Sequence, residues 1–181
     1  MTKRLKRLAG ALPILVLLLA LLPELSLTAY ADEAVIYPLW VGDTQVTGEN
    51  AEDETGERGW SYAADTNTLT LSGIDISTYY TKEDDSAGIW YEGDDALNIV
   101  LSSDNTINPS GSDSFDYGIE SAANGGIELS GDGSLTVKAF DAGINTEGSG
   151  NIVISGGTIT ATGDDFGGFC HTRIITRRRL E

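Results

Sequence analysis

Short runs in which apolar and polar residues alternate at every second position recur along the chain. Ile127-Glu128-Leu129 and Leu135-Thr136-Val137 are two examples, and Gly, Asp, Asn and Ser separate such runs. Alternation with a period of two predicts β-strands that bury one face. The runs are short and carry no 3.6-residue periodicity, which disfavours helices. The pattern therefore predicts an all-β protein.

The strand pattern also repeats in phase. A dipeptide whose first residue is Gly recurs at spacings of 30, 25 and 24 residues. These pairs are Gly88-Ile89, Gly118-Ile119, Gly143-Ile144 and Gly167-Gly168. A unit of this length with three short strands matches one coil of a parallel β-helix, whose equivalent residues stack about 4.8 Å apart.

The sequence thus predicts a short right-handed parallel β-helix of about three to four coils. An antiparallel sandwich is the alternative, but it does not explain the in-phase recurrence. The positions expected to face the core are Ile119, Ile127, Leu129, Leu135, Val137, Ile144, Ile152, Ile154, Ile159 and Ala161.

The segment before the coils has a different pattern. Residues 37–41 and 44–46 flank Gly42-Asp43, and residues 60–62 and 68–71 flank a second turn sequence. Each arrangement predicts a β-hairpin. We assign residues 32–80 to an N-terminal β cap with the first strands and residues 81–167 to the coils, because a solenoid needs a cap over its first apolar positions.

Both ends of the chain differ in composition from the repeat. Residues 1–31 combine a basic start, an apolar run and Ala29-Tyr30-Ala31, the order of a cleavable signal peptide. We therefore expect a secreted or cell-surface protein with no membrane span after cleavage; an uncleaved anchor is the alternative. Residues 168–181 form a basic tail without counterpart upstream, which is either a tail with its own role or, as we favour, a sign that a longer solenoid is truncated at its C-terminal side.

Charge narrows the classes of partner. The chain carries a formal net charge of -17, and residues 32–172 hold three basic and 26 acidic side chains. Such a segment repels phosphate backbones, which argues against nucleic-acid binding, and attracts cations. With one Cys and one His, the chain can form neither an internal disulfide nor a Cys/His zinc site.

Aspartates precede each Gly-led pair. In stacked coils Asp116, Asp141 and Asp165 are expected in one column, with Asp85 one position out of phase. Carboxylates about 5 Å apart repel one another, and Ca²⁺ takes 6–8 oxygen ligands of this kind. The column is a candidate calcium site; the alternative is that Asp serves only as a hydrated turn former.

Aromatic residues suggest a second kind of site. Tyr79, Tyr80 and Trp90 lie next to acidic residues, and Trp90 is expected to point outward because Ile89 points inward. Outward aromatic rings beside hydrogen-bonding groups are typical of sugar platforms. Packing of Tyr79 and Tyr80 on the cap is the alternative.

Catalysis is not expected. A polysaccharide lyase needs a basic side chain, usually with Ca²⁺, to remove a proton next to a carboxylate. Within residues 32–172 the basic side chains are Arg58, Lys82 and Lys138, and Lys138 ends a predicted strand near Asp141, where a base and a metal ion could lie side by side. We favour a surface ion pair as the interpretation of that neighbourhood.

The motifs at 37–47, 60–62 and 66–73, together with Gly88-Ile89-Trp90 and residues 152–161, resemble secreted β-helix repeat proteins of Firmicutes. They are also similar to carbohydrate-binding β-helix domains of clostridial cell-surface proteins. The resemblance implies a calcium-stabilised module that binds a polysaccharide or a host or cell-wall glycan. A structural spacer of a bacterial surface protein is the first alternative, and a lyase-like enzyme is the second.

Overall fold

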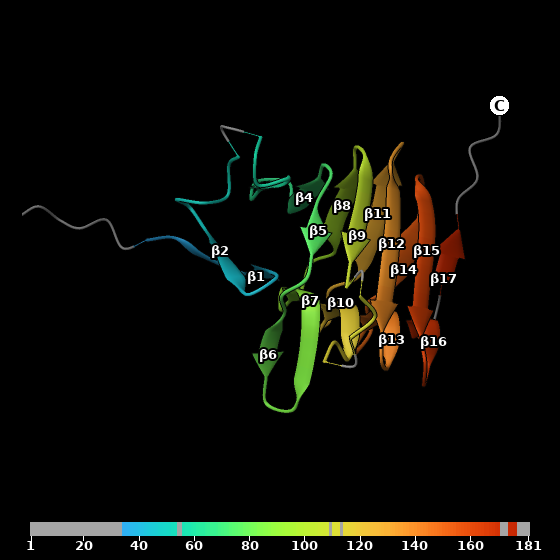
Figure 1. Ribbon diagram of the computed structural model, residues 1–181. Coiled ribbons are helices and arrows are strands. Elements are labelled where there is room, and N and C mark those ends of the chain that lie inside the picture. Colours follow the sequence, from blue (N-terminus) through green and yellow to red (C-terminus); the bar gives the residue numbers. More distant parts are fainter. Residues whose placement is uncertain (1–33, 54–55, 109, 113, 171–173, 177–181) are drawn as a thin grey trace, which may run out of the picture. The chain divides into compact units, whose positions relative to one another are not determined.

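The computed structural model describes residues 34–53, 56–108, 110–112, 114–170 and 174–176 (Figure 1). The signal peptide predicted for residues 1–31 lies outside these residues. Within them the chain forms strands and turns and no helices, which confirms the all-β prediction. Accordingly, no helix in the described part of the chain is long and apolar enough to cross a membrane.

The described strands form three sheets, named A, B and C here. Sheet A contains β1 (Ile36–Val41), β2 (Thr44–Thr47), β6 (Tyr80–Lys82), β7 (Asp85–Tyr91), β10 (Tyr117–Ser121), β13 (Ala142–Thr146) and β16 (Gly167–Cys170). Sheet B contains β3 (Trp60–Ala63), β4 (Thr68–Leu71), β8 (Leu97–Leu101), β11 (Ile127–Gly131), β14 (Ile152–Ile154) and β17 (Ile174–Thr176). Sheet C contains β5 (Asp75–Ile76), β9 (Asp104–Ile107), β12 (Ser134–Ala139) and β15 (Thr158–Gly163).

From β7 onward the chain supplies one strand to each sheet in turn. The order β7–β8–β9, β10–β11–β12 and β13–β14–β15 repeats A, B, C, and we call each such triplet a repeat. Strands of successive repeats pair in parallel in all three sheets, as β7, β10 and β13 do in sheet A (Figure 1). This pairing agrees with the predicted in-phase recurrence and does not fit an antiparallel sandwich.

Antiparallel pairing is confined to the early part of the described chain. The two predicted hairpins are present as β1–β2 and β3–β4. A third antiparallel pair, β6–β7, was not expected from the sequence. Because β1 also pairs antiparallel with β7, the first strand of sheet A's parallel series is joined to both β1 and β6.

The core follows the predicted inward positions. Seven of these predicted side chains are completely buried: Ile119, Ile127, Leu129, Leu135, Val137, Ile144 and Ile152. In the last repeat Ile154, Ile159 and Ala161 are only partly buried and pack against this core. Burial of apolar side chains on this scale, at about 25 cal/mol per Å², is the main source of stability for the sheets.

A row of glycines marks where sheet A approaches sheet C. A Cβ atom added at Gly88 would lie 2.5 Å from Ile107 Cγ2, and one at Gly143 would lie 2.8 Å from Ala161 Cβ. At Gly118 the added atom would overlap the Val137 side chain and lie 2.5 Å from the Gly143 carbonyl oxygen. Real Cβ atoms do not tolerate such contacts, so this crowding explains why Gly precedes the inward Ile in each repeat.

A row of hydroxyl groups fixes the turn that follows sheet A. Tyr91, Ser121 and Thr146 occupy the same register position in β7, β10 and β13. Each hydroxyl donates a hydrogen bond to the carbonyl four residues later, at 2.9 Å for Tyr91, 2.6 Å for Ser121 and 3.5 Å for Thr146. The buried polar row is therefore internally satisfied.

Asn105 joins three successive passages of the chain. It is 1% exposed and lies in register with Leu135. Its Oδ1 accepts from the backbone N–H groups of Gly73 and Ile74, and its Nδ2 donates to the carbonyls of Ser103 and Ser134. The Asn105 amide thus forms hydrogen bonds with four backbone groups, which would need other partners in its absence.

The last interval of the repeat is one residue longer than predicted. Ile144 pairs with Phe169, and Ala142 pairs with Gly167. Gly168, rather than Gly167, therefore occupies the glycine row. The Gly167-Gly168 sequence allows either alignment, and the larger buried area that Phe169 gains opposite Ile144 favours the observed one.

The predicted boundary at residue 168 also differs from the structure. Gly167–Cys170 forms β16 on sheet A, and Ile174–Thr176 forms β17, which pairs with β14 in sheet B. The described part of the predicted basic tail therefore continues the repeat. Backbone pairing needs no repeated side chains, which is why the composition break at this point did not predict it.

Replacing Gly118 with Ala should lower the free energy of unfolding by about 1–3 kcal/mol or more. The new methyl group would force Val137 or the backbone to shift. Urea unfolding of the Gly118→Ala variant measures this. Gly48→Ala is the matched control, since its Cβ would meet only Val35 at an ordinary 3.4 Å. Equal stability of the two variants would contradict the crowding argument.

Replacing Asn105 with Ala should cost about 1–3 kcal/mol or more, because buried backbone groups would lose their partners. Asn98→Ala serves as the control, since Asn98 donates one hydrogen bond to the Thr66 carbonyl at the surface. Thermal unfolding of both variants should show a clearly larger loss for Asn105→Ala; similar losses would count against this role.

Candidate functional site

The outer face of sheet A carries one row of side chains that differ sharply in chemistry. Trp90, Glu120, Asn145 and Cys170 pair in register across β7, β10, β13 and β16. Their chain neighbours Ile89, Ile119 and Ile144 are completely buried in the core. Since adjacent residues of a strand point to opposite faces, the row faces away from that core.

Strand β6 folds over one end of this row. The Tyr80 ring stacks on Trp40 with centroids 4.3 Å apart and meets Trp90 edge-on at 5.8 Å. The Trp90 side chain is consequently only 3% exposed although it lies on the outer face. Offset and edge-to-face pairs of this kind add about 0.5–1.5 kcal/mol beyond the area that they bury.

Glu92 links β6 to the end of β7. Its Oε1 atom lies 2.6 Å from Lys82 Nζ and accepts a hydrogen bond from Trp90 Nε1 at 2.8 Å. The hydrogen bond to Glu92 raises the pKa of Lys82. Lys82 is thereby held as a cation beside Trp90.

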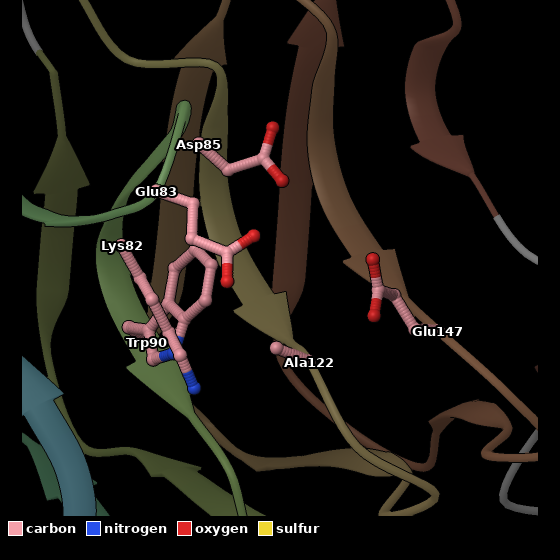
Figure 2. Close-up of a pocket in the computed structure, with 6 residues that line it drawn as sticks. All are labelled: Lys82, Glu83, Asp85, Trp90, Ala122 and Glu147. Carbon is pink, nitrogen blue, oxygen red and sulfur yellow. The ribbon is translucent and has the colours of Figure 1, made fainter.

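A recess of about 200 Å³ opens beside β6 and β7. Six residues line it: Lys82, Glu83, Asp85, Trp90, Ala122 and Glu147. Figure 2 shows the carboxylates of Glu83 and Asp85 on one side of the recess and that of Glu147 across from them. Three acidic groups and one indole thus surround a single small space.

Glu120 lies in the same row as Trp90 and is 1% exposed. Neither of its carboxylate oxygens forms a hydrogen bond with a described group, although the Asn145 amide is close enough to favour the charged form. Burial raises the pKa of Glu120 from 4.5 to about 8, and the charges of Glu147 and Asp85 raise it further in the same direction. At neutral pH Glu120 is therefore mainly a neutral carboxylic acid.

The structure brings together part of the predicted calcium column. The backbone N–H of Asp141 donates to the Asp116 carbonyl at 2.9 Å, which places these two residues side by side. Asp165 is displaced by one residue, because Phe166 donates the equivalent bond to Asp141. Asp165 is thus one position out of register, but its charge, after burial and the charge of Asp116, still raises the pKa of Asp141. Asp85 is one position out of phase as expected, since Ser86 lies opposite Asp116.

The carboxylates of this column influence one another. Burial, followed by the charge of Asp116, raises the pKa of both Asp85 and Asp141. Asp116 Oδ2 accepts hydrogen bonds from the backbone N–H and hydroxyl of Ser86 at 2.8 and 2.7 Å. In the described part of the chain no three Asp, Glu, His or Cys side chains are grouped closely enough to hold a metal ion. Calcium binding by Asp85, Asp116, Asp141 and Asp165 stays a prediction.

The predicted sugar-binding aromatics have different surroundings. Trp90 lines the recess but presents little of its surface, and Tyr80 is half-buried between the two tryptophans. Tyr79 is 38% exposed and meets Phe115 edge-on at 5.1 Å. The broad outward platform expected of Trp90 is therefore reduced by β6, and a sugar role for all three residues stays a prediction.

Sequence reasoning identified only part of the acidic side of the recess. Asp85 was selected, as a candidate calcium ligand, whereas Glu83, Glu120 and Glu147 were not among the predicted site residues. A signal existed for Glu120, since it occupies the outward position equivalent to Trp90 one repeat later. No periodic signal marks Glu83, which lies in the β6–β7 turn with a φ of 56°.

The other basic residues lie away from the recess lining. The Arg58 guanidinium packs over Trp60, 4.7 Å from its ring centroid, and donates to the carbonyls of Asn50 and Glu52. Lys138 lies in β12 of sheet C, opposite Thr162. Neither Arg58 nor Lys138 is among the residues that line the recess.

Comparison of the chain with protein-family models, curated proteins and solved structures finds no match. The resemblance to secreted β-helix repeat proteins is therefore a prediction from the motifs alone.

Glu120→Gln should flatten the fall of stability with rising pH. An acid whose pKa is raised on folding keeps its proton in the native state after the unfolded chain has lost it, so the free energy of unfolding falls between about pH 4.5 and about pH 8. Urea unfolding at about pH 5 and about pH 8 should show a drop in the parent protein that is smaller in Glu120→Gln by up to a few kcal/mol.

Glu128→Gln is the control, because it removes one carboxylate from the face of a different sheet. Asp85 and Asp141, whose raised pKa values act in the same direction, remain in both proteins. The same pH dependence in Glu120→Gln and the parent would contradict a neutral Glu120.

Proposed function

We propose that the described repeats form a right-handed parallel β-helix. Support comes from the cyclic order of sheets A, B and C and from the parallel pairing of successive repeats. Connections between parallel strands of one sheet are right-handed in nearly all proteins, which supports the handedness. On this proposal the hairpins β1–β2 and β3–β4 act as the N-terminal cap.

We further propose that the protein is a non-catalytic carbohydrate-binding module, exported to the cell surface or beyond. The observation that carries this is the recess beside β6 and β7, where the Trp90 indole and several carboxylates line one space. Sugars combine apolar C–H faces with many hydroxyl groups, so an aromatic wall beside hydrogen-bond acceptors suits them. Export rests on the sequence of residues 1–31.

The basic residues favour binding over lyase chemistry. Lys82, the cation in the recess lining, is paired with Glu92, and this pairing raises its pKa. A lyase base must accept a proton, and a raised pKa keeps Lys82 protonated at neutral pH. Lys138 belongs to sheet C and lies apart from the recess.

A structural spacer is the second candidate function, favoured by one observation. The ladders of β7–β10–β13 and β8–β11–β14 continue from repeat to repeat through backbone pairing, which does not depend on which side chains line the recess. Calcium bound along Asp85, Asp116, Asp141 and Asp165 would serve either function, since it would offset both the burial and the repulsion from Asp116 that raise the pKa of Asp85 and Asp141.

A glycan array probed with the purified protein, with and without Ca²⁺, tests the proposal. We expect at least one polysaccharide signal, weakened several-fold by Glu147→Gln in the recess and unchanged by Glu128→Gln on sheet B. Ca²⁺ should raise the melting temperature, and Asp141→Asn should reduce that rise. Absence of any glycan signal would leave the spacer as the better account, and an unchanged melting temperature would exclude the calcium site.

A further inference from the structure

The charges around the recess are unbalanced. Glu83, Asp85 and Glu147 line it, and their carboxylates face one space from two sides (Figure 2). Lys82 is the basic residue in the lining, and Glu92, which is outside the lining, already neutralises it at 2.6 Å. A ligand in this space therefore meets an excess of negative charge.

Glu120 adds a second, independent feature. It is 1% exposed, its carboxylate oxygens form no hydrogen bond with a described group although the Asn145 amide favours the charged form, and it stands two residues before the recess-lining Ala122. Its register partner Trp90 also lines the recess. The charged groups that act on Glu120 are Glu147 and Asp85, both in the lining. Glu120 is not itself part of the lining, but a cation bound in the recess would favour the charged form of this buried carboxyl group.

We infer that the recess binds a sugar unit that carries a free, protonated amine, as in a polysaccharide that has lost its N-acetyl groups. The inference rests on the carbohydrate-binding function proposed above and names the class of sugar. An ammonium group offers three hydrogen-bond donors and no acceptor, so it can donate to carboxylates placed around it. The Trp90 indole beside it adds attraction to a cation.

Two other ligand classes fit less well. An acidic sugar such as a uronate would bring its carboxylate against Glu83, Asp85 and Glu147 and be repelled. A divalent metal ion needs several ligands within about 2.3–2.6 Å, and among the described residues the recess acids Glu83, Asp85 and Glu147 do not form such a group; calcium at the aspartate column is a separate proposal. The volume of about 200 Å³ is below that of pockets for drug-sized ligands and suits one sugar unit.

Calorimetric titration of the purified protein at low salt and slightly acidic pH tests the inference. The probes are a tetramer of glucosamine, the same tetramer fully N-acetylated, and a tetramer of galacturonate. We expect the glucosamine tetramer to bind about tenfold more tightly than the acetylated one, which corresponds to about 1.4 kcal/mol. The galacturonate tetramer should bind most weakly.

Variants separate the recess from the general acidity of the protein. Asp85→Asn and Glu147→Gln should each weaken glucosamine-tetramer binding about fivefold or more, as expected for removal of one charge from a partly enclosed ion pair. Glu128→Gln, which removes a carboxylate from sheet B, should change it less than about twofold. Near-ultraviolet circular dichroism confirms that each variant is folded.

The outcomes distinguish this inference from the function on which it rests. Equal affinity for the acetylated and free tetramers, or an equal loss in Glu128→Gln and Glu147→Gln, would overturn the amine preference. If the acetylated tetramer then still depended on Glu147, carbohydrate binding in the recess would stand. Absence of binding to every tetramer and to the glycan array would overturn both.

Discussion

The close approach of sheets A and C at the glycine row is the constraint on which the other features depend. Ile107, Val137 and Ala161 occupy the space into which a Cβ at Gly88, Gly118 or Gly143 would project. In β7, β10 and β13 only one alignment puts a glycine at this point, so the crowding fixes the register of these three strands. Because side chains alternate between faces, a slip of one residue would exchange the buried and exposed sets. The register in which the glycines meet sheet C is therefore also the register that places Trp90, Glu120 and Asn145 in one row.

The recess owes its existence to a departure from the repeat. A regular stack of parallel strands presents an even outer surface, and β10 and β13 by themselves offer no wall. Strand β6 supplies that wall by pairing antiparallel with β7 and bringing Lys82 and Glu83 alongside Trp90. The same strand shields Trp90 and holds Glu92 in its ion pair with Lys82. The acidic side chains and the indole of the recess therefore come together where the irregular strand β6 meets the regular sheet.

Alternation in the sequence was sufficient to predict strands, the two early hairpins and the inward residues such as Leu129 and Leu135, because these depend on local pattern and burial. It failed where two alignments were equally compatible with the pattern, as at Gly167-Gly168, and where pairing came from backbone alone, as in β17. The site was harder to predict for a different reason. An outward acid such as Glu120 is expected in solvent, and its burial depends on neighbours from other strands. Likewise Tyr79, Tyr80 and Trp90 were recognised as a cluster, but residues 80–82 gave no sign that they would cover Trp90.

Strand β7 has a feature with a separate consequence. Along the side that faces away from β10, Lys82, Thr81 and Tyr80 pair with Asp85 to Ala87, the Gly42 N–H donates to the Gly88 carbonyl at 2.7 Å, and β1 pairs with Ile89 to Tyr91. The polar backbone groups of a free sheet edge are a template on which strands of other molecules can assemble into fibrils. Here two short segments from different parts of the chain divide that edge between them. A foreign strand could join sheet A at β7 only after displacing one of them, so this end of the parallel series is protected against edge-to-edge aggregation.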